Sequence, residues 1–429
     1  MNNSTTDFFD YTKGVRQGCP LSALLFNVYV NDIFDILNNG NESNIFVKEG
    51  ELINVLMYAD DLILLSETKE GLQQQINKLS DFCVKWKLDV NTKKTKIMVF
   101  NRGNNLIKSE FYINNIILQN VKIFKYLGFT ISAKNCSFAP TMDDLSLRAN
   151  CAVYALNNKI KLSRLPTRIA LKIFKCQIVP ILIYGSEVWG PYQNNNYTTW
   201  DKSNIERVHT QFLKRILGCN IQTSNIMTRG EVGHRPLLLE ILKRYVLYKK
   251  NVIARKTSIV NTAFEFETSN DVNPNFCDFV ENFNLINTEL FDVEKRALHY
   301  LCRDSYDRIW KAEIMESPKA LSYKLIKYSV FPEKYLFVVK NIKHKISLSR
   351  FRLSSHSLMI EKGRQMRPRK ERDERKCFQC KDIVEDEIHF LIECPLYDKE
   401  RETLFQTCRD KCKNFNSLVT KEQKFNIMT

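Results

Sequence analysis

No stretch of this sequence has the roughly 18 uncharged apolar residues that a membrane-spanning helix needs. The nearest candidate, residues 169–184, is interrupted by Lys172, Lys175 and Pro180, so we predict no membrane partner. A secretory signal is also missing, because residues 1–7 are polar and acidic rather than basic and then apolar. Without such a signal, the 13 cysteines favour an intracellular, reducing compartment in which thiols are free or bound to metal.

Acidic residues are too few to balance the basic ones, and the formal net charge is +16 with a sequence pI of about 9.2. This excess favours a polyanionic partner, and nucleic acid is the first candidate. The charge is uneven: residues 158–175 carry six Lys or Arg and no acid, whereas residues 257–294 carry eight Asp or Glu and no Lys or Arg. At 429 residues, 44% of them apolar, the chain has room for two or three folded domains.

The N-terminal part alternates helix and strand patterns. Apolar residues recur at helical spacing after Pro20, which suits a first helical turn, and again after Thr68, which suits an N-cap. Residues 97–100, 111–118 and 124–131 have the composition of strands. We therefore predict an α+β fold in which a small antiparallel sheet has helices on one face.

We expect five segments along the chain. They are an α+β part at residues 1–132, a basic helical region at 140–256, an acidic insertion or linker at 257–294, a second helical region at 295–361, and a basic arm with a small cysteine-rich module at 362–412.

Two adjacent acids, Asp60 and Asp61, lie between short apolar runs at residues 53–57 and 62–65. The pattern predicts a β-hairpin with buried flanks and both carboxylates at its turn. Neighbouring carboxylates repel each other and are costly to desolvate, and a divalent cation removes that cost. Metals held in this way stabilise the attacking and leaving oxygens in nucleotidyl transfer. An ordinary solvated turn, which also favours Asp, is the alternative.

The order of motifs around this turn favours the metal site. Residues 14–22 (GVRQGCPLS) lead into the first helix, and a glycine there lets the backbone approach a ligand closely. Residues 58–61 (YADD), 91–95 (NTKKT) and 124–129 (FKYLGF) follow in order. The series resembles the palm of reverse transcriptases from non-LTR, LINE-type retrotransposons. Residues 14–32 look like the B motif of that family, and the three later segments look like its C, D and E motifs.

The resemblance implies RNA-templated DNA synthesis, with an RNA template, a DNA primer, deoxynucleoside triphosphates and Mg²⁺. Carried over by position, Asp60 would bind magnesium and Asp61 would support it. Lys94 would approach the triphosphate as a charge clamp or a proton donor; its alternative is a solvated lysine in a basic run. The residues that would contact the substrates are Arg16, Gln17, Gly18 and Tyr58. The family also implies a nuclear location, although the sequence has no clear import signal.

The tail carries a second, independent pattern, Cys377-x2-Cys380-x8-His389-x4-Cys394. Three thiols and an imidazole are the ligand set of a closed structural zinc site. The pattern and its surroundings closely resemble the C-terminal CCHC module of LINE-type proteins. The alternative is that the cysteines are small buried apolar residues and His389 is a core histidine. A tail this short and charged has little apolar core of its own, which favours Zn²⁺.

Residues near the CCHC pattern suggest further contacts. Residues 362–376 are strongly charged and nearly free of apolar side chains, which suits a linker or a basic arm that contacts phosphates. Phe378 and Tyr397 suit either stacking on unpaired bases or packing on the zinc loop. His209 and His234 have no partner constellation in the sequence, so we expect structural or surface roles for them.

The resemblance to the polymerase family has a gap. The family places another catalytic aspartate on a strand before its B motif, whereas only thirteen residues precede Gly14. Asp7 and Asp10 lie there, but without the strand, helix and linker that the family places between the two motifs. We expect a truncated LINE-type polymerase, and a non-catalytic RNA- or DNA-binding remnant of a retroelement is the alternative.

We predict that the purified chain alone has no template-directed polymerase activity, because two-metal chemistry would lack a bridging ligand. Primer extension on an RNA template measures this directly. Nucleotide incorporation that Asp60→Asn abolishes would contradict the prediction.

Overall fold

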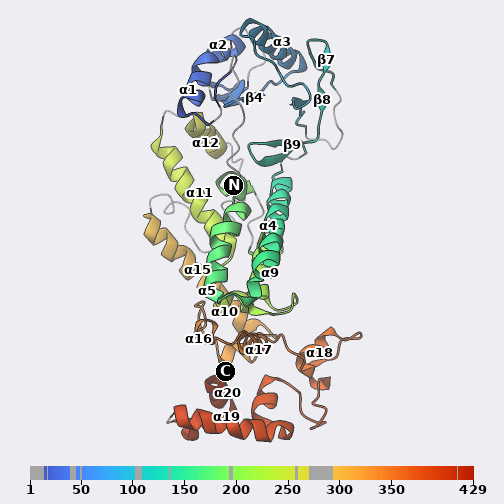
Figure 1. Ribbon diagram of the computed structural model, residues 1–429, viewed down its shortest axis with the longest axis vertical. Helices are drawn as coiled ribbons and strands as arrows, with labels where there is room; N and C mark the ends of the chain where they lie inside the picture. Colours follow the sequence, from blue (N-terminus) through green and yellow to red (C-terminus); the bar gives the residue numbers. More distant parts are fainter. Residues whose placement is uncertain are drawn as a thin grey trace, which may run out of the picture. The chain divides into compact units, whose positions relative to one another are not determined.

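The computed structural model describes residues 14–16, 18–38, 45–48, 51–101, 109–134, 137–192, 197–256, 259–269, 293–412 and 414–429 (Figure 1). The chain divides into two units. Unit 1 comprises Met1–Ser137 and Arg255–Val272, and unit 2 comprises Phe138–Ala254 and Asn273–Thr429. The segments predicted at 140–256, 295–361 and 362–412 thus belong to unit 2, except for the last two residues of the first segment. Most of the predicted acidic segment at 257–294 lies outside the described residues.

Unit 1 combines short strands with four helices in its described residues. The helices are α1 (Pro20–Tyr29), α2 (Ile33–Asn38), α3 (Lys69–Lys85) and α12 (Ile259–Ser269). The strands are β1 (Phe46–Lys48), β2 (Glu51–Leu52), β3 (Val55–Tyr58), β4 (Asp61–Leu64), β5 (Lys96–Ile97), β6 (Tyr112–Ile113), β7 (Ile116–Ile117), β8 (Gln119–Asn120), β9 (Ile123–Tyr126) and β10 (Phe129–Ser132).

The strands form separate two-stranded ladders rather than the single small sheet that we predicted. In the described residues, β1 pairs with β2, β3 with β4, β6 with β7 and β9 with β10, all antiparallel, and β5 pairs with β8 in parallel. Strands of two to four residues offer few ladder hydrogen bonds to a further neighbour. The α+β composition is confirmed, whereas the continuous antiparallel sheet is not.

Two predicted strands are in fact hairpins. Residues 111–118 fold into β6 and β7 around Asn114 and Asn115, which both have positive φ. Asn tolerates the left-handed region, so the chain reverses there. Residues 124–131 likewise divide into β9 and β10 at Leu127. Apolar composition alone did not separate one strand of eight residues from two shorter ones.

Helix α3 anchors the core of unit 1. The side chain of Thr68 accepts a hydrogen bond from the Gly71 N–H at 3.1 Å, which confirms the predicted N-cap. Ile76, Phe82 and Cys83 of α3 are buried. Phe82 and Cys83 form a cluster with side chains of α2 and β3, and Ile76 forms a second cluster with β5 and β6. The helices therefore pack on the strands, as the α+β pattern predicts.

The helix predicted from Pro20 onward is broken. A turn at Val30–Asp32 separates α1 from α2. The apolar side chains of α1 face water, with Leu21 61% and Val28 68% exposed. By length and composition alone, Pro20–Asn38 passes as a membrane span, and so does the bent pair Thr167–Leu182 with Ser186–Tyr192. One or two such helices are weak evidence for a membrane span.

Unit 2 is helical in its described residues. Its α-helices are α4 (Ala139–Ile160), α5 (Thr167–Ile173), α6 (Val179–Leu182), α7 (Ser186–Trp189), α8 (Tyr197–Trp200), α9 (Asn204–Leu217), α10 (Asn225–Val232), α11 (Leu237–Ala254), α15 (Lys295–Glu316), α16 (Tyr335–Val338), α17 (Ile342–Arg352), α18 (Met359–Gln365), α19 (Asp398–Lys411) and α20 (Lys421–Met428). Its short 3₁₀ turns are η1 (Leu162–Arg164), η3 (Gly190–Tyr192), η4 (Tyr323–Leu325), η5 (Arg372–Glu374), η7 (Pro395–Tyr397) and η8 (Phe415–Ser417), and its π-helical turns are η2 (Phe174–Ile178) and η6 (His389–Glu393).

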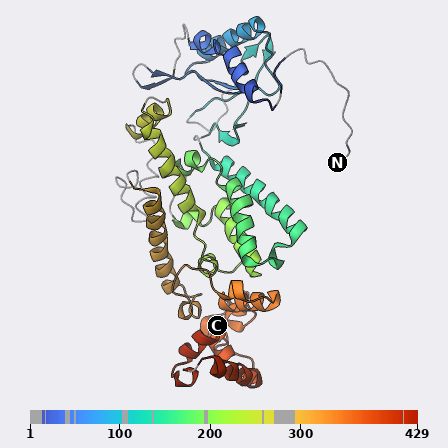
Figure 2. The ribbon, with the colours of Figure 1, turned by 60° about the vertical axis from the view of Figure 1, so that its left-hand side comes forward.

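Long helices lie side by side in unit 2. Helix α4 packs along α9, and α11 packs against α15 (Figures 1 and 2). Trp189, Trp200 and Trp310 are fully buried within the unit. Burying such large side chains stabilises the unit by several kcal/mol in total, at about 1.5–3 kcal/mol for each large apolar side chain.

A charged network is buried with these aromatic rings. The Glu206 carboxylate is fully buried and accepts hydrogen bonds from Arg229 Nη2 at 2.9 Å, His209 Nδ1 at 2.8 Å and Trp200 Nε1 at 2.9 Å. Arg229, also fully buried, makes a further ion pair with Asp201. His209 and its neighbour His234 therefore have structural roles, as we expected. A charge removed from this network would leave its partner desolvated and unpaired.

We predict that Glu206 makes unit 2 sensitive to acid. Burial raises the pKa of this carboxyl, but Arg229 and His209 outweigh burial and lower it to about 2, against a usual 4.5. Its stabilising effect is thus complete above pH 4.5 and is lost as the pH falls toward 2. Glu206→Gln should lower the free energy of unfolding at neutral pH by roughly 3–5 kcal/mol and flatten its acid dependence.

Urea unfolding followed by circular dichroism at several pH values measures both effects. The control is Glu316→Gln, which alters an exposed carboxylate at the end of α15 and should leave the profile unchanged. Equal acid sensitivity in the wild type and Glu206→Gln would refute the prediction.

Candidate nucleotidyl-transfer and metal sites

The predicted acidic hairpin exists. Strands β3 and β4 are antiparallel, Tyr58 pairs with Asp61, and Ala59 and Asp60 form the two-residue turn. Ala59 has a φ of 54°, an uncommon conformation for a residue other than glycine. The backbone therefore places Asp60 and Asp61 at the tip of a tight hairpin.

The burial predicted for this hairpin is wrong. Val55 is buried, but Leu56 is 39% exposed and Tyr58 66% exposed. One face of the hairpin packs on α2 and α3 while the other faces water, as a two-stranded ribbon allows. Asp60 and Asp61 are exposed. Their carboxylates thus do not need a cation to offset desolvation, and the argument for a metal there rests on the motif.

The hairpin of β9 and β10 belongs to the same unit as these acids. Burial raises the pKa of Tyr126 on β9, and the negative charge of Asp61 raises it further. This electrostatic influence on Tyr126 is what links the segments that resemble the C and E motifs.

The loop before α1 is shaped by glycine. Gly18 has a φ of +83°, and an added Cβ would meet no atom within 4 Å, so backbone conformation and not space demands glycine. Arg16 is exposed, and its carbonyl accepts a hydrogen bond from Ser22 Oγ at 2.6 Å. Gln17 lies outside the described residues.

Lys94 lies in a turn, with its backbone N–H donating to the carbonyl of Asn91 at 3.0 Å. Its side chain is exposed. Within the described residues, no hydrogen bond or ion pair joins Lys94 or Arg16 to Asp60 or Asp61. The role that we predict for Lys94 in approaching a triphosphate stays a prediction.

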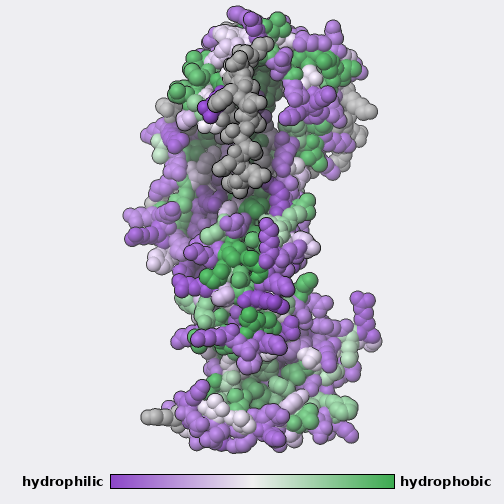
Figure 3. Space-filling view, in the orientation of Figure 1, coloured by the Kyte–Doolittle hydropathy of each residue, from purple (hydrophilic) through white to green (hydrophobic). Residues whose placement is uncertain are grey.

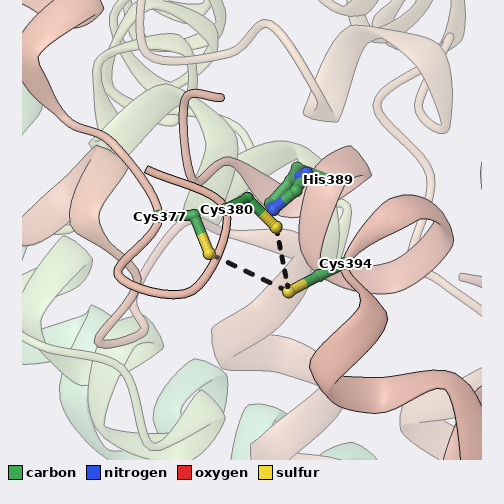
Figure 4. A group of neighbouring side chains, drawn as sticks. All are labelled: Cys377, Cys380, His389 and Cys394. Atoms are coloured by element: carbon green, nitrogen blue, oxygen red, sulfur yellow. Dashed lines mark hydrogen bonds between the residues drawn. The ribbon is translucent and has the colours of Figure 1, made fainter. Parts of the chain in front are cut away.

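The second site is a compact cluster. Ligand atoms of Cys377, Cys380, His389 and Cys394 all lie within 4.8 Å of one another (Figure 4). In the described part of the chain, they form the one group of at least three residues able to hold a metal ion. Cys377, His389 and Cys394 are buried. The four residues that the sequence singled out therefore converge.

The cluster fits a tetrahedral ion. The Sγ atoms of Cys377 and Cys394 are 3.8 Å apart, and those of Cys380 and Cys394 are 3.9 Å apart. A zinc ion with Zn–S bonds of about 2.3 Å separates two tetrahedral sulfurs by about 3.8 Å, whereas a disulfide needs about 2.05 Å. His389 Nε2 is buried and has no hydrogen-bond partner among the described residues. A buried nitrogen without a hydrogen-bond partner can instead ligate a metal ion.

The thiols differ in acidity. Burial raises the pKa of Cys377, but a hydrogen bond from the Cys380 backbone and the neighbouring His389 side chain lower it to about 7. Burial and the thiol groups of Cys394 and Cys377 raise the pKa of Cys380 to about 11. Thiolates this close repel one another, so a divalent cation is required for all three to ligate as anions.

Two residues that support His389, Glu393 and Lys421, were not predicted from the sequence. Glu393 accepts a hydrogen bond from His389 Nδ1 at 3.2 Å, and Lys421 of α20 pairs with Glu393. A carboxylate on the far nitrogen fixes the tautomer of a ligating histidine and raises its basicity. Glu393 was discoverable, since it follows His389 by one helical turn. Lys421 was not, because 28 residues separate it from Glu393.

Hydrogen bonds of Glu387 connect the metal cluster to the rest of unit 2. The Glu387 carboxylate is buried and accepts hydrogen bonds from Ser322 Oγ at 2.8 Å, Ser354 Oγ at 2.7 Å and His356 Nε2 at 2.9 Å. Burial raises the pKa of Glu387, but His356 and the two serines lower it to about 2. The cluster is thus part of the helical body and not a loosely tethered tail.

The segment at 362–376, predicted as a linker or basic arm, is folded. It includes the end of α18 and η5. Arg375 is only 3% exposed, and its guanidinium donates to the carbonyls of Lys370 and Ile360. Charged composition suggested solvation, but these carbonyls satisfy the guanidinium inside the protein.

Comparisons with known proteins show what parts of the chain resemble. Residues 1–131 match the family described as reverse transcriptase (RNA-dependent DNA polymerase). The chain is 26% identical over 244 residues to a probable RNA-directed DNA polymerase from transposon BS of Drosophila melanogaster, covering 54% of this chain and 25% of that protein. It is 26% identical over 255 residues to a retrovirus-related Pol polyprotein from type-1 retrotransposable element R2 of Popillia japonica, covering 57% and 34%. The RNA-directed DNA polymerase from mobile element jockey of Drosophila funebris is 26% identical over 192 residues, covering 41% and 19%.

Residues 1–131 are therefore similar to a reverse transcriptase domain. The relatives are RNA-directed DNA polymerases of non-LTR retrotransposons, so the predicted resemblance to LINE-type reverse transcriptases is confirmed. The chain spans only a quarter to a third of the length of the first two relatives.

We predict that Glu393 strengthens metal binding by orienting His389. Glu393→Ala should weaken zinc affinity by roughly 10–100-fold, and Glu393→Gln, which keeps an acceptor but loses the charge, should fall between it and the wild type. Competition with a chromophoric chelator measures the affinity. Glu422→Ala, which removes an exposed acid on α20, is the matched control. Equal affinities for Glu393→Ala and the control would count against this role.

Proposed function

We propose that this chain provides the catalytic turn and the downstream nucleic-acid-binding region of a LINE-type RNA-directed DNA polymerase. One observation carries the proposal: within the segment that matches reverse transcriptases, two adjacent exposed acids lie at the tip of the β3–β4 hairpin. The substrates would be an RNA template, a DNA primer and deoxynucleoside triphosphates.

In this proposal Asp60 and Asp61 hold magnesium, for which exposed carboxylate oxygens are suitable ligands. Magnesium, when bound, supplies charge stabilisation for nucleotidyl transfer. Lys94 neutralises the triphosphate. Gln17 and Gly18 lie near the nascent base pair, and Arg16 and Tyr58 also contact the substrates.

Zinc at Cys377, Cys380, His389 and Cys394 has a structural role in the proposal, since four protein ligands leave no open position for substrate. The metal would stabilise the fold of the last part of unit 2, where few apolar side chains besides Cys394 and Phe425 are buried.

Unit 2 offers a basic surface to the nucleic-acid backbone. Hydrophilic residues surround apolar patches on the face shown in Figure 3. From the end of α4 through η2, six basic side chains are exposed with no acid among residues 158–175: Lys159, Lys161, Arg164, Arg168, Lys172 and Lys175. Lys and Arg on one stretch neutralise phosphates and release counterions. By family resemblance alone, we also propose that the protein works in the nucleus.

We predict that Fe²⁺ in place of Mg²⁺ cleaves the backbone near the β3–β4 turn when peroxide is added, because bound iron generates hydroxyl radicals locally. Asp60→Asn and Asp61→Asn should each remove this cleavage. Asp89→Asn is the control, since it removes the same charge from an exposed position of unit 1. The readout does not require polymerase activity.

Mass spectrometry of the fragments decides between two functions. Cleavage at the turn that depends on Asp60 and Asp61 supports a polymerase site. Cleavage that is absent, or unchanged in both variants, together with salt-sensitive RNA binding, would instead indicate the non-catalytic nucleic-acid-binding remnant.

A further inference from the structure

Phe378 is unusual in its exposure. At 92%, it exceeds every other large apolar side chain among the described residues, followed by Val419 at 89%. Single exposed apolar residues are common and need no explanation by themselves. Phe378, however, lies between two residues of the metal cluster, Cys377 and Cys380, in a turn whose backbone is fixed.

Several contacts hold this turn rigid. The Cys377 N–H donates to the Ile383 carbonyl at 2.8 Å, and the Lys381 N–H donates to the Cys377 carbonyl at 2.9 Å. Lys376 and Val384 form a β-bridge. Cys377 itself is 4% exposed. The ring of Phe378 is thus presented to solvent from a backbone that loses little further entropy when a ligand binds.

The role of packing on the metal loop is filled by another residue. The Tyr397 ring lies 4.6 Å from that of Phe390 in an edge-to-face arrangement, and Phe390 in turn lies 5.8 Å from Phe351. The sequence left Phe378 and Tyr397 with the same two alternatives. The structure separates them, because Tyr397 packs and Phe378 does not.

The surroundings of Phe378 match a nucleotide. Exposed Lys376 and Lys381 flank the turn, exposed Gln379 adjoins the ring, and Asp382 is the acid of this loop. Cations beside an open aromatic face suit a ligand with a flat apolar ring and a phosphate. The apolar core of a protein interface, by contrast, is depleted of Lys.

We propose that Phe378 is a stacking platform for an unpaired base of single-stranded RNA or DNA. This inference rests on the nucleic-acid partner of the proposed function and assigns one contact within it. An unpaired base is required, since the bases of a duplex have their faces covered by their neighbours. Stacking on one aromatic side chain tolerates any base.

The test measures binding by the full, zinc-loaded chain to a fluorescein-labelled single-stranded RNA of about 12 nucleotides, and to a duplex of the same length. Phe378→Ala should weaken single-strand binding by roughly 5–150-fold and leave duplex binding and zinc content unchanged. Phe378→Trp should retain the affinity. Ile383→Ala, which removes another exposed apolar side chain of the same loop, is the matched control.

A second measurement does not depend on the alanine variant. In the wild-type complex, 2-aminopurine placed in the single strand should be quenched, and Phe378→Trp should show quenching of its added indole. Unchanged affinity in Phe378→Ala, equal loss on duplex, or absence of quenching would each overturn the platform. No binding of the wild type to either RNA would instead overturn the nucleic-acid partner of the proposed function.

Discussion

Repulsion between neighbouring ligating groups is the constraint that governs both candidate metal sites, and the chain meets it in two ways. Asp60 and Asp61 remain in water at the tip of a hairpin, where solvent screens their charges. Their geometry is stable without an ion, so an ion there would serve chemistry. Cys377 and Cys394 are instead buried with their sulfurs 3.8 Å apart. Ionised thiols cannot be held in that way without a cation, so an ion there would serve folding.

Unit 2 repeatedly buries a carboxylate and surrounds it with donors. Glu206 lies against Arg229, Glu231 accepts from Arg352 Nε at 2.6 Å, and Glu387 accepts from two serines and His356. Each carboxylate joins segments far apart in sequence, such as α10 and α17. Buried ion pairs of this kind contribute little net stability compared with apolar packing. An incorrect packing of the helices, however, would leave a buried charge without its partner. They therefore favour one packing of the helices over others.

Local patterns were predicted well, and contacts between distant residues were not. The hairpin at Asp60, the cap at Thr68 and the convergence of four ligands around His389 each follow from a few adjacent residues. The turn at Val30 that breaks the first helix and the folded state of residues 362–376 depend on tertiary partners. The pairing of Lys421 with Glu393 depends on a helix near the end of the chain. The exposure of Phe378 could not be predicted either, since phenylalanine is among the residue types most often buried.

The division of the chain also bears on how it folds during synthesis. Unit 1 is discontinuous: α12 lies against β1, yet it is made only after the long helices from α4 to α11 have been translated. Domains generally fold as they leave the ribosome, starting from the N-terminus. The contacts between α12 and β1 therefore form only after the first long helices of unit 2 have been synthesised. Until then β1 lacks this covering helix, and an uncovered strand edge favours aggregation.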